Sequence, residues 1–237
     1  MSIGDGEADR RLPSVPEPDW ADRIEPMPTE GTGEQGWRRW ATETVPELAR
    51  SARQAGPRSI LNGRWLVDTT MAAAARIRPR DHETLTRHHR GRPDEEIARV
   101  LIRNAALATG SIGAATGALV TFQQAAPPTW SIIPFELAAE TAMVVGVELK
   151  LVAELHQLAD RPIAGGGPGE RTMLLVGSWA EKRGVSATVL LGGGDLLSRQ
   201  ARNALARTLR TRLAGRMGRN MATLAPLMAG AAAGAEI

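Results

Sequence analysis

The apolar positions of the chain recur with helical spacing from about residue 37 onward, and proline and glycine residues divide them into segments. Helices are expected at about 44–55, 59–77, 93–122, 134–158 and 170–183, with a last long segment from 195 onward. The pattern predicts an all-α fold, in which about six helices form a bundle within one domain over residues 37–237.

Local start signals support these limits. Thr44 and Glu47 have the spacing of a capping box, and Pro46 falls in the first turn, where no backbone N–H is needed. Pro93 begins a long helix, and three acids follow it at the positive end of the helix dipole. Asp195 is a favourable N-cap for the last helix.

The stretch 93–160 organises this prediction, because it contains two long helices joined by a short turn at 127–130. At 100° per residue, the second half of its first helix presents a stripe of small residues that includes Gly110, Gly113 and Gly117. Each glycine costs a helix interior about 1 kcal/mol, so three of them indicate a groove for close helix packing. A break of the helix near Gly110 is the alternative.

The same stretch has no charged residue between Arg103 and Glu136. The part of it from Asn104 to Phe122, about 19 uncharged residues, reaches the length of a candidate membrane span. These residues are mostly Ala, Gly, Thr and Ser, which partition weakly into lipid, and the next helix carries Glu140, Glu148 and Lys150. The pattern therefore favours the core of a soluble bundle over a two-span hairpin.

The N-terminal part of the chain is acidic, and the rest of the chain is basic. Residues 1–36 carry nine acids and three arginines, a net charge of −6, and the rest of the chain carries about +9. Because residues 1–36 are also rich in Pro and Gly, they are expected to form a disordered acidic tail, in which Trp20 and Met27 are isolated. Residues 80–92 contain three histidines and are expected to be a solvated basic loop rather than a metal site.

The last helix combines an apolar stripe with many arginines. Every fourth residue from Leu205 to Met221 is Leu or Met. Seven arginines surround this stripe and are the candidate contacts to an anionic membrane surface or a membrane-protein partner: Arg199, Arg202, Arg207, Arg210, Arg212, Arg216 and Arg219. No aromatic platform or recognised motif accompanies them, so nucleic acid is not an expected partner.

Candidate chemistry is sparse. Glu136 and Glu140 could face a common site as acid and base, although the helix dipole favours acids in the first turns for structural reasons alone. Glu154 and His156 are two positions apart, which turns their side chains roughly 160–200° from each other and excludes one shared metal ion. The glycine runs at 165–169 and 192–194 lack the Lys-Ser/Thr of a P-loop, and the chain has no cysteine. No cofactor and no metal site is expected.

Several segments of the second half share a further pattern. They are Ile-Ala-Arg-Val-Leu-Ile-Arg at 97–103, the small-residue run at 108–117, the apolar helix at 134–158, Gly-Glu-Arg at 169–171 and Leu-Ala-Pro-Leu at 224–227. Together they resemble the EcsC family of bacterial proteins over about residues 92–237. The resemblance implies a helical bacterial protein without an assigned activity, in some members associated with an ABC-transporter operon. It brings no catalytic residues with it.

These features lead us to expect a non-enzymatic helical protein of the bacterial cytoplasm, attached peripherally to the cytoplasmic membrane face or bound to a membrane-protein partner. The acidic N-terminus, with no apolar run after it, supports the cytoplasmic location. Two alternatives stay open. One is an enzyme with Glu136 and Glu140 in an interhelical pocket, and the other is an oligomerising scaffold, with a homo-oligomer as its assembly and the acidic tail as a docking segment.

Overall fold

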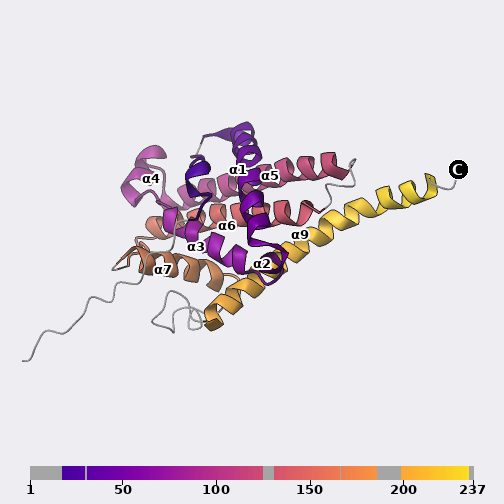
Figure 1. Ribbon diagram of the computed structural model, residues 1–237. Helices are drawn as coiled ribbons and strands as arrows, with labels where there is room; N and C mark the ends of the chain where they lie inside the picture. Colours follow the sequence, from indigo (N-terminus) through magenta and orange to yellow (C-terminus); the bar gives the residue numbers. More distant parts are fainter. Residues whose placement is uncertain (1–17, 30, 125–130, 166, 186–198, 235–237) are drawn as a thin grey trace, which may run out of the picture.

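The computed structural model is all-helical in the residues that it describes, which are 18–29, 31–124, 131–165, 167–185 and 199–234 (Figure 1). This confirms the predicted all-α class and helical bundle. The helices are η1 (Ala21–Arg23), α1 (Gly33–Ala55), α2 (Pro57–Leu61), α3 (Arg64–Arg76), α4 (His82–His88), α5 (Asp94–Gln124), α6 (Ile133–Leu158), α7 (Pro168–Glu181) and α9 (Arg199–Gly234).

Helix α6 is the centre of the bundle. Helices α1, α3, α5, α7 and α9 all pack against it, so it is enclosed on several sides (Figure 1). A helix that is apolar around most of its circumference is stable only when it is surrounded, and α6 is buried from Glu136 to Val147 without a gap. The polar groups that α6 carries therefore have to find partners on the surrounding helices.

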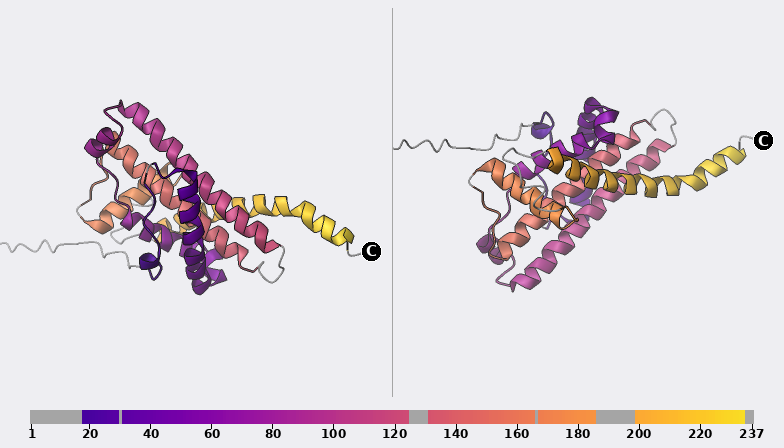
Figure 2. Two further views of the ribbon diagram at one scale, coloured as in Figure 1. Left: turned by 90° about the horizontal axis from the view of Figure 1, so that it is seen from above. Right: turned by 90° about the horizontal axis from the view of Figure 1, so that it is seen from below.

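Helix α5 runs antiparallel to α6 and lies beside it (Figure 2). It continues unbroken through Gly110, so the predicted long helix is confirmed and the alternative of a break is wrong. Its core-facing positions include Ile97, Leu101, Ala108 and Ile112, which recur at intervals of four and seven residues. The connection at 125–130, which contains the whole predicted turn at 127–130, lies outside the described residues.

Helix α1 begins at Gly33, eleven residues before the predicted capping box at Thr44. Thr44 is buried inside the helix, and Pro46 is also an interior residue, so the predicted helix start is wrong. The physical reason lies upstream. Trp37 and Trp40 place their rings in the core, 5.7 Å apart and nearly perpendicular, and this burial extends the helix beyond the local signal.

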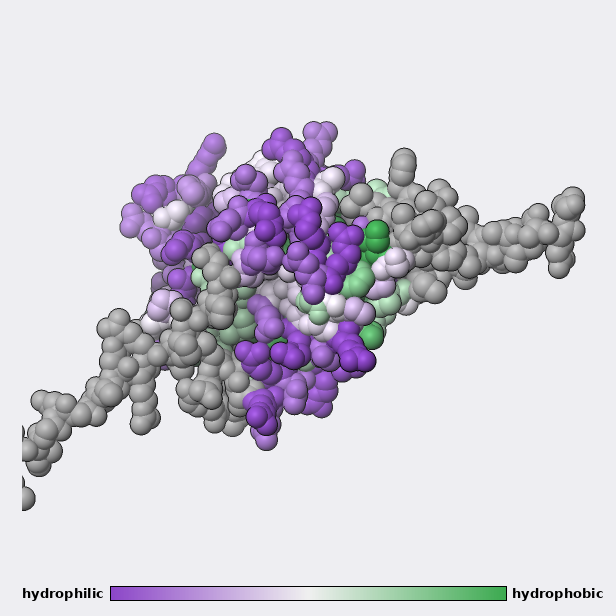
Figure 3. Space-filling view, viewed as in Figure 1, coloured by the Kyte–Doolittle hydropathy of each residue, from purple (hydrophilic) through white to green (hydrophobic). Residues whose placement is uncertain are grey.

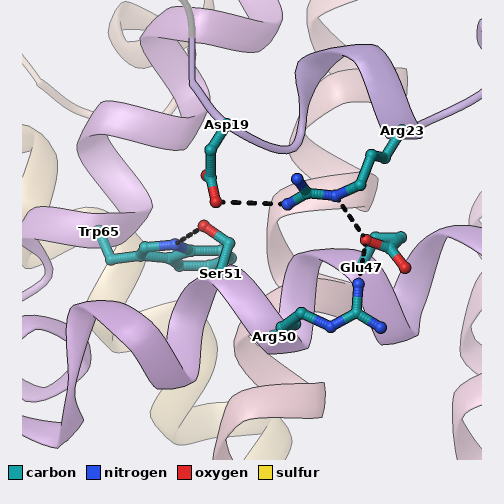
Figure 4. A network of polar contacts seen from close by, with 6 residues as sticks. All are labelled: Asp19, Arg23, Glu47, Arg50, Ser51 and Trp65. Carbon is teal, nitrogen blue, oxygen red and sulfur yellow. Dashed lines mark hydrogen bonds and ion pairs between the residues drawn. The ribbon is translucent and has the colours of Figure 1, made fainter.

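The N-terminal segment, residues 18–29, packs on the bundle, so the predicted disordered tail does not extend to residue 36. Trp20 is only 6 % exposed and joins the core, while the indole N–H of Trp40 donates to the carbonyl of Glu25 at 3.0 Å. Figure 4 shows Arg23 between Asp19, at 3.3 Å, and Glu47 of α1, at 2.9 Å. Residues 1–17 lie outside the described residues.

The predicted single helix at 59–77 is divided into α2 and α3 by Gly63. This glycine has a φ of +78°, a conformation that costs other residues about 1–2 kcal/mol. It also lies against α9, because a Cβ at this position would be 3.0 Å from the carbonyl oxygen of Ala206 and 3.1 Å from its Cβ. The break therefore lets α9 pass close to the start of α3.

The predicted loop at 80–92 contains helix α4, so the loop prediction is wrong for 82–88. The carboxylate of Asp81 accepts from the backbone N–H of Thr84 at 2.8 Å and caps this short helix. Leu85 is fully buried with Ile97 and Leu158 in a second, smaller hydrophobic cluster. One leucine is thus enough to hold a polar segment against the ends of α5 and α6.

The close approach at Gly63 gives a stability prediction. We expect Gly63→Ala to lower the free energy of unfolding by about 2–4 kcal/mol, because it adds a steric clash with α9 to the cost of a positive φ. Gly184→Ala is the matched control, since Gly184 also has a positive φ of +79° but no heavy atom within 4 Å of a Cβ. The control should lose only about 1–2 kcal/mol in urea unfolding. Equal losses would contradict the close packing of α9 on α3.

Candidate functional site

The C-terminal helix α9 is divided between a part that packs on the body and a part that extends away from it (Figures 1 and 2). Leu205, Leu209 and Leu213 are buried against the bundle, as the four-residue repeat predicted. The repeat comes to the surface at Met217, which is 36 % exposed, and the side chain of Met221 lies outside the described residues.

An ionic cluster fixes the packed part of α9 to the centre of the bundle. Glu148 of α6 receives Arg212 of α9 at 2.7 and 3.2 Å, and Arg183, just after α7, at 2.8 Å. Both guanidinium groups lie near the ring of Trp179, at 4.5 Å for Arg183 and 5.5 Å for Arg212. The indole N–H of the fully buried Trp179 donates to the same carboxylate at 3.0 Å. One carboxylate therefore joins α6, α7 and α9.

The environment of Glu148 favours its ionised form. Burial alone would raise the pKa of this carboxyl group, but the hydrogen bond and charge of Arg212 oppose it, with help from Trp179 and Arg183. The net result is a pKa below the ordinary value. The pKa of Arg183 is lowered, first by burial and then by the nearby positive charge of Arg212, against the attraction of Glu148.

Glu140, one member of the predicted carboxylate pair, also pairs with α9. Its Oε1 accepts from Arg216 at 2.6 Å. Gly113 of α5 faces the same oxygen, because a Cβ on Gly113 would lie 3.7 Å from it. Glu136 is one turn earlier on α6 and is also buried. The structure therefore brings Glu136 and Glu140 to neighbouring positions inside the bundle, with Glu140 engaged by an arginine rather than open to a substrate.

A third acid of α6 pairs at the other end of the helix. Arg80, in the connection between α3 and α4, binds both oxygens of Glu154 at 2.9 and 3.0 Å. Glu154 is 4 % exposed, so this bidentate contact provides the polar partners that its buried carboxylate requires. Together the three carboxylates Glu140, Glu148 and Glu154 tie α6 to three other parts of the chain.

The seven arginines predicted as membrane or partner contacts fall into different groups. Arg212 and Arg216 point inward to the acids of α6. Arg202 forms an exposed pair with Asp68 of α3 at 3.2 Å. Arg199, Arg207 and Arg210 are exposed and form no ion pair within the part of the chain that the structure describes. The side chain of Arg219 lies outside that part.

The predicted packing groove on α5 is mostly open. Gly110 and Gly117 are exposed, and a Cβ on either would meet no heavy atom within 4 Å. Only Gly113 faces another helix, at Glu140. Gly110 and Gly117 therefore lie on the outer side of α5, while the larger residues Leu101 and Ile112 take the inner side.

The histidines do not form a metal centre in the described part of the chain, where no group of three or more His, Cys, Asp or Glu side chains could hold an ion. His82 lies 3.1 Å from Asp94 and 3.6 Å from Asp160, and the hydrogen bond to Asp94 raises its pKa. His156 lies 3.3 Å from the hydroxyl of Ser178, and burial, followed by the charge of Lys182, lowers its pKa. His82 and His156 thus each have a local polar contact.

The face of the molecule in Figure 3 is largely hydrophilic over the body, and hydrophobic residues gather on its right-hand side. Large hydrophobic side chains that reach the surface include Leu61, Ile102, Leu107 and Met217. None of the helices, within the described residues, is long and apolar enough to cross a membrane.

Comparison with family models, with curated proteins and with solved structures finds no match for this chain.

Sequence reasoning missed the partners of the buried acids. Glu148 was visible only as a charge inside an apolar helix, and Trp179, Arg183 and Arg80 carried no signal of their own. A buried carboxylate on an otherwise apolar helix requires a nearby cation, so the sequence could have indicated that Glu148 pairs with an arginine. Which of the 27 arginines supplies it depends on tertiary packing.

The ionic cluster gives a second stability prediction. We expect Glu148→Gln to lower the free energy of unfolding by about 2–4 kcal/mol, because it leaves the guanidinium groups of Arg183 and Arg212 close together without their counter-charge. Glu83→Gln is the control, since Glu83 is 85 % exposed in its pair with Arg87. That control should change the same free energy by less than about 0.5 kcal/mol. A similar small effect of both substitutions in urea unfolding would contradict the role of the cluster.

The lowered pKa of Glu148 gives a pH prediction. A carboxyl whose pKa is lower in the folded chain than in the unfolded chain adds stability above the unfolded value of about 4.3, and this stability is lost as the pH falls through the folded value. Between about pH 5 and about pH 3, the wild-type chain should therefore lose more stability than Glu148→Gln. If the free energies of unfolding of the wild type and of Glu148→Gln fell in parallel over this pH range, the role of Glu148 in the pH dependence would be refuted.

Proposed function

We propose that this chain is a non-enzymatic helical protein that attaches peripherally to an anionic membrane surface through α9. The observation that carries the proposal is the division of the arginines on this helix. Arg212 and Arg216 are used inside the bundle, while Arg199, Arg207 and Arg210 stay exposed without an ion pair in the described part of the chain.

The exposed arginines share one side of the helix. At 100° per residue, Arg199, Arg207 and Arg210 fall within about 80° of one another, and Met217 falls at the same side. On the same wheel, the buried leucines 205, 209 and 213 lie roughly 40–160° away from these arginines, on the flank of the helix that packs against the bundle. Because the inward contacts fix the rotation of α9, the outward side is a defined surface with three positive charges.

Such a side suits a surface with anionic headgroups. Each arginine near an anionic leaflet contributes about 1 kcal/mol of attraction, so three of them give roughly a hundredfold preference over a neutral surface. Beyond the body, α9 continues through a stretch without charge from Asn220 to Gly234. Leu, Met and Ala in that stretch fit the boundary between headgroups and acyl chains.

Two further considerations support this proposal. The resemblance to the EcsC family implies a bacterial protein without an assigned activity, which in some members is associated with an ABC-transporter operon. A membrane-protein partner would use the same outward side of α9, and the experiment below distinguishes it from lipid.

The enzyme alternative is weakened because Arg216 holds Glu140 at 2.6 Å, an arrangement with a structural purpose.

Vesicle flotation with the full chain tests the proposal. We expect binding to vesicles that contain phosphatidylglycerol, little binding to pure phosphatidylcholine, and release by added salt. Replacing Arg199, Arg207 and Arg210 together by Gln should weaken the binding at least about tenfold. The matched control replaces Arg78, Arg92 and Arg103, three exposed arginines outside α9, and should leave binding within about twofold.

Absence of binding to anionic vesicles would overturn the lipid assignment and leave a protein partner as the use of this surface. Equal losses in the two triple variants would show that net charge alone, and not the outward side of α9, drives the association.

A further inference from the structure

A cavity of about 210 Å³ lies on the side of α6 that faces α1 and α5. The N-terminal segment covers one side of it with Met27 and Pro28, and Trp37 of α1 adds an indole ring. No residue of α9 lines this cavity, so its use does not depend on the function proposed for that helix.

The walls of the cavity are mainly apolar. Leu101, Ala105 and Ala108 of α5 face Val147 and Leu151 of α6 across it. A pocket of this size is smaller than the roughly 300–1,000 Å³ that drug-sized ligands occupy, so it selects a small molecule.

The cover of the cavity is held in place. The methyl group of Met27 lies against Gly146 of α6, since a Cβ on that glycine would be 3.4 Å from it. The indole of Trp40 binds the carbonyl of Glu25, two residues before Met27, at 3.0 Å. These contacts hold the N-terminal segment against α1 and α6 at one side of the cavity.

Among the described residues that line the cavity, the charged groups leave one positive charge in excess. Arg80 and Glu154 line it, but they neutralise each other in their bidentate pair. Lys150 also lines it, is half-buried, and forms no ion pair within the described residues. An ammonium group next to apolar walls, with its own counter-charge missing, is complementary to a single negative charge on an apolar ligand.

We propose that this cavity binds a small amphipathic monocarboxylate, such as a fatty acid of about eight carbons. Its carboxylate accepts hydrogen bonds from the ammonium group of Lys150, and its alkyl chain lies against Leu101, Ala105 and Val147. A single cation without an ion pair in the described part of the chain matches a carboxylate better than a doubly charged phosphate ester, whose second charge would lie beside the already neutral Arg80–Glu154 pair.

The composition of the chain makes the test direct, because Lys150 and Lys182 are its only lysines. With ¹³C-labelled lysine, the full-length chain gives two side-chain spin systems. Titration with sodium octanoate should shift the signal of Lys150, in a saturable manner with one site, and leave that of the exposed Lys182 in place. Octylamine should shift neither signal, and 1-octanol should bind at least about tenfold more weakly than octanoate.

Two variants complete the experiment. Lys150→Met should weaken octanoate binding at least about tenfold in calorimetry, while the matched control Lys182→Met should leave it unchanged. Ala105→Leu fills the cavity and should abolish the Lys150 shift; its circular dichroism, compared with the wild type, establishes that it is folded. Equal binding of octanol, a shift of Lys182 alone, or an unchanged affinity in Lys150→Met would each overturn the proposal.

Discussion

The arrangement of this protein depends on the neutralisation of acids carried by its central helix. Helix α6 is surrounded by α1, α3, α5, α7 and α9, yet it contains Glu140, Glu148 and Glu154. A buried carboxylate without a cation is costly, by several kcal/mol, so each of these acids constrains where an arginine must lie. Glu140 pairs with Arg216, Glu148 pairs with Arg212 and Arg183, and Glu154 pairs with Arg80.

This constraint connects the core to the surface of α9. Because Arg212 and Arg216 must point toward α6, the rotation of α9 about its own axis is fixed, and Arg199, Arg207 and Arg210 are directed outward. The surface proposed to meet a membrane is thus determined by charges inside the bundle. The cavity beside Lys150 follows a similar logic, since α6 carries there a cation that the described part of the chain does not neutralise.

The sequence predicted the long helices well, because the periodic apolar positions of α5 and α6 and the glycines and prolines between segments are local properties. Its errors arose where tertiary burial outweighed a local signal: Trp37 extended α1 past the capping box, and Leu85 ordered a polar loop. The sequence could not predict the ion pairs, because Glu148 and Arg212 are 64 positions apart. Many other arginines were equally plausible partners by charge alone.

Hydrogen exchange of the native chain, compared between the wild type and the double variant Glu140→Gln/Glu148→Gln, tests the central role of these acids most directly. The account predicts that the amides of α9 from 199 to 217 exchange at least about tenfold faster in the double variant, while those of α1 and α6 stay protected. Unchanged exchange in α9 would show that the leucine stripe alone holds this helix, and would contradict the account.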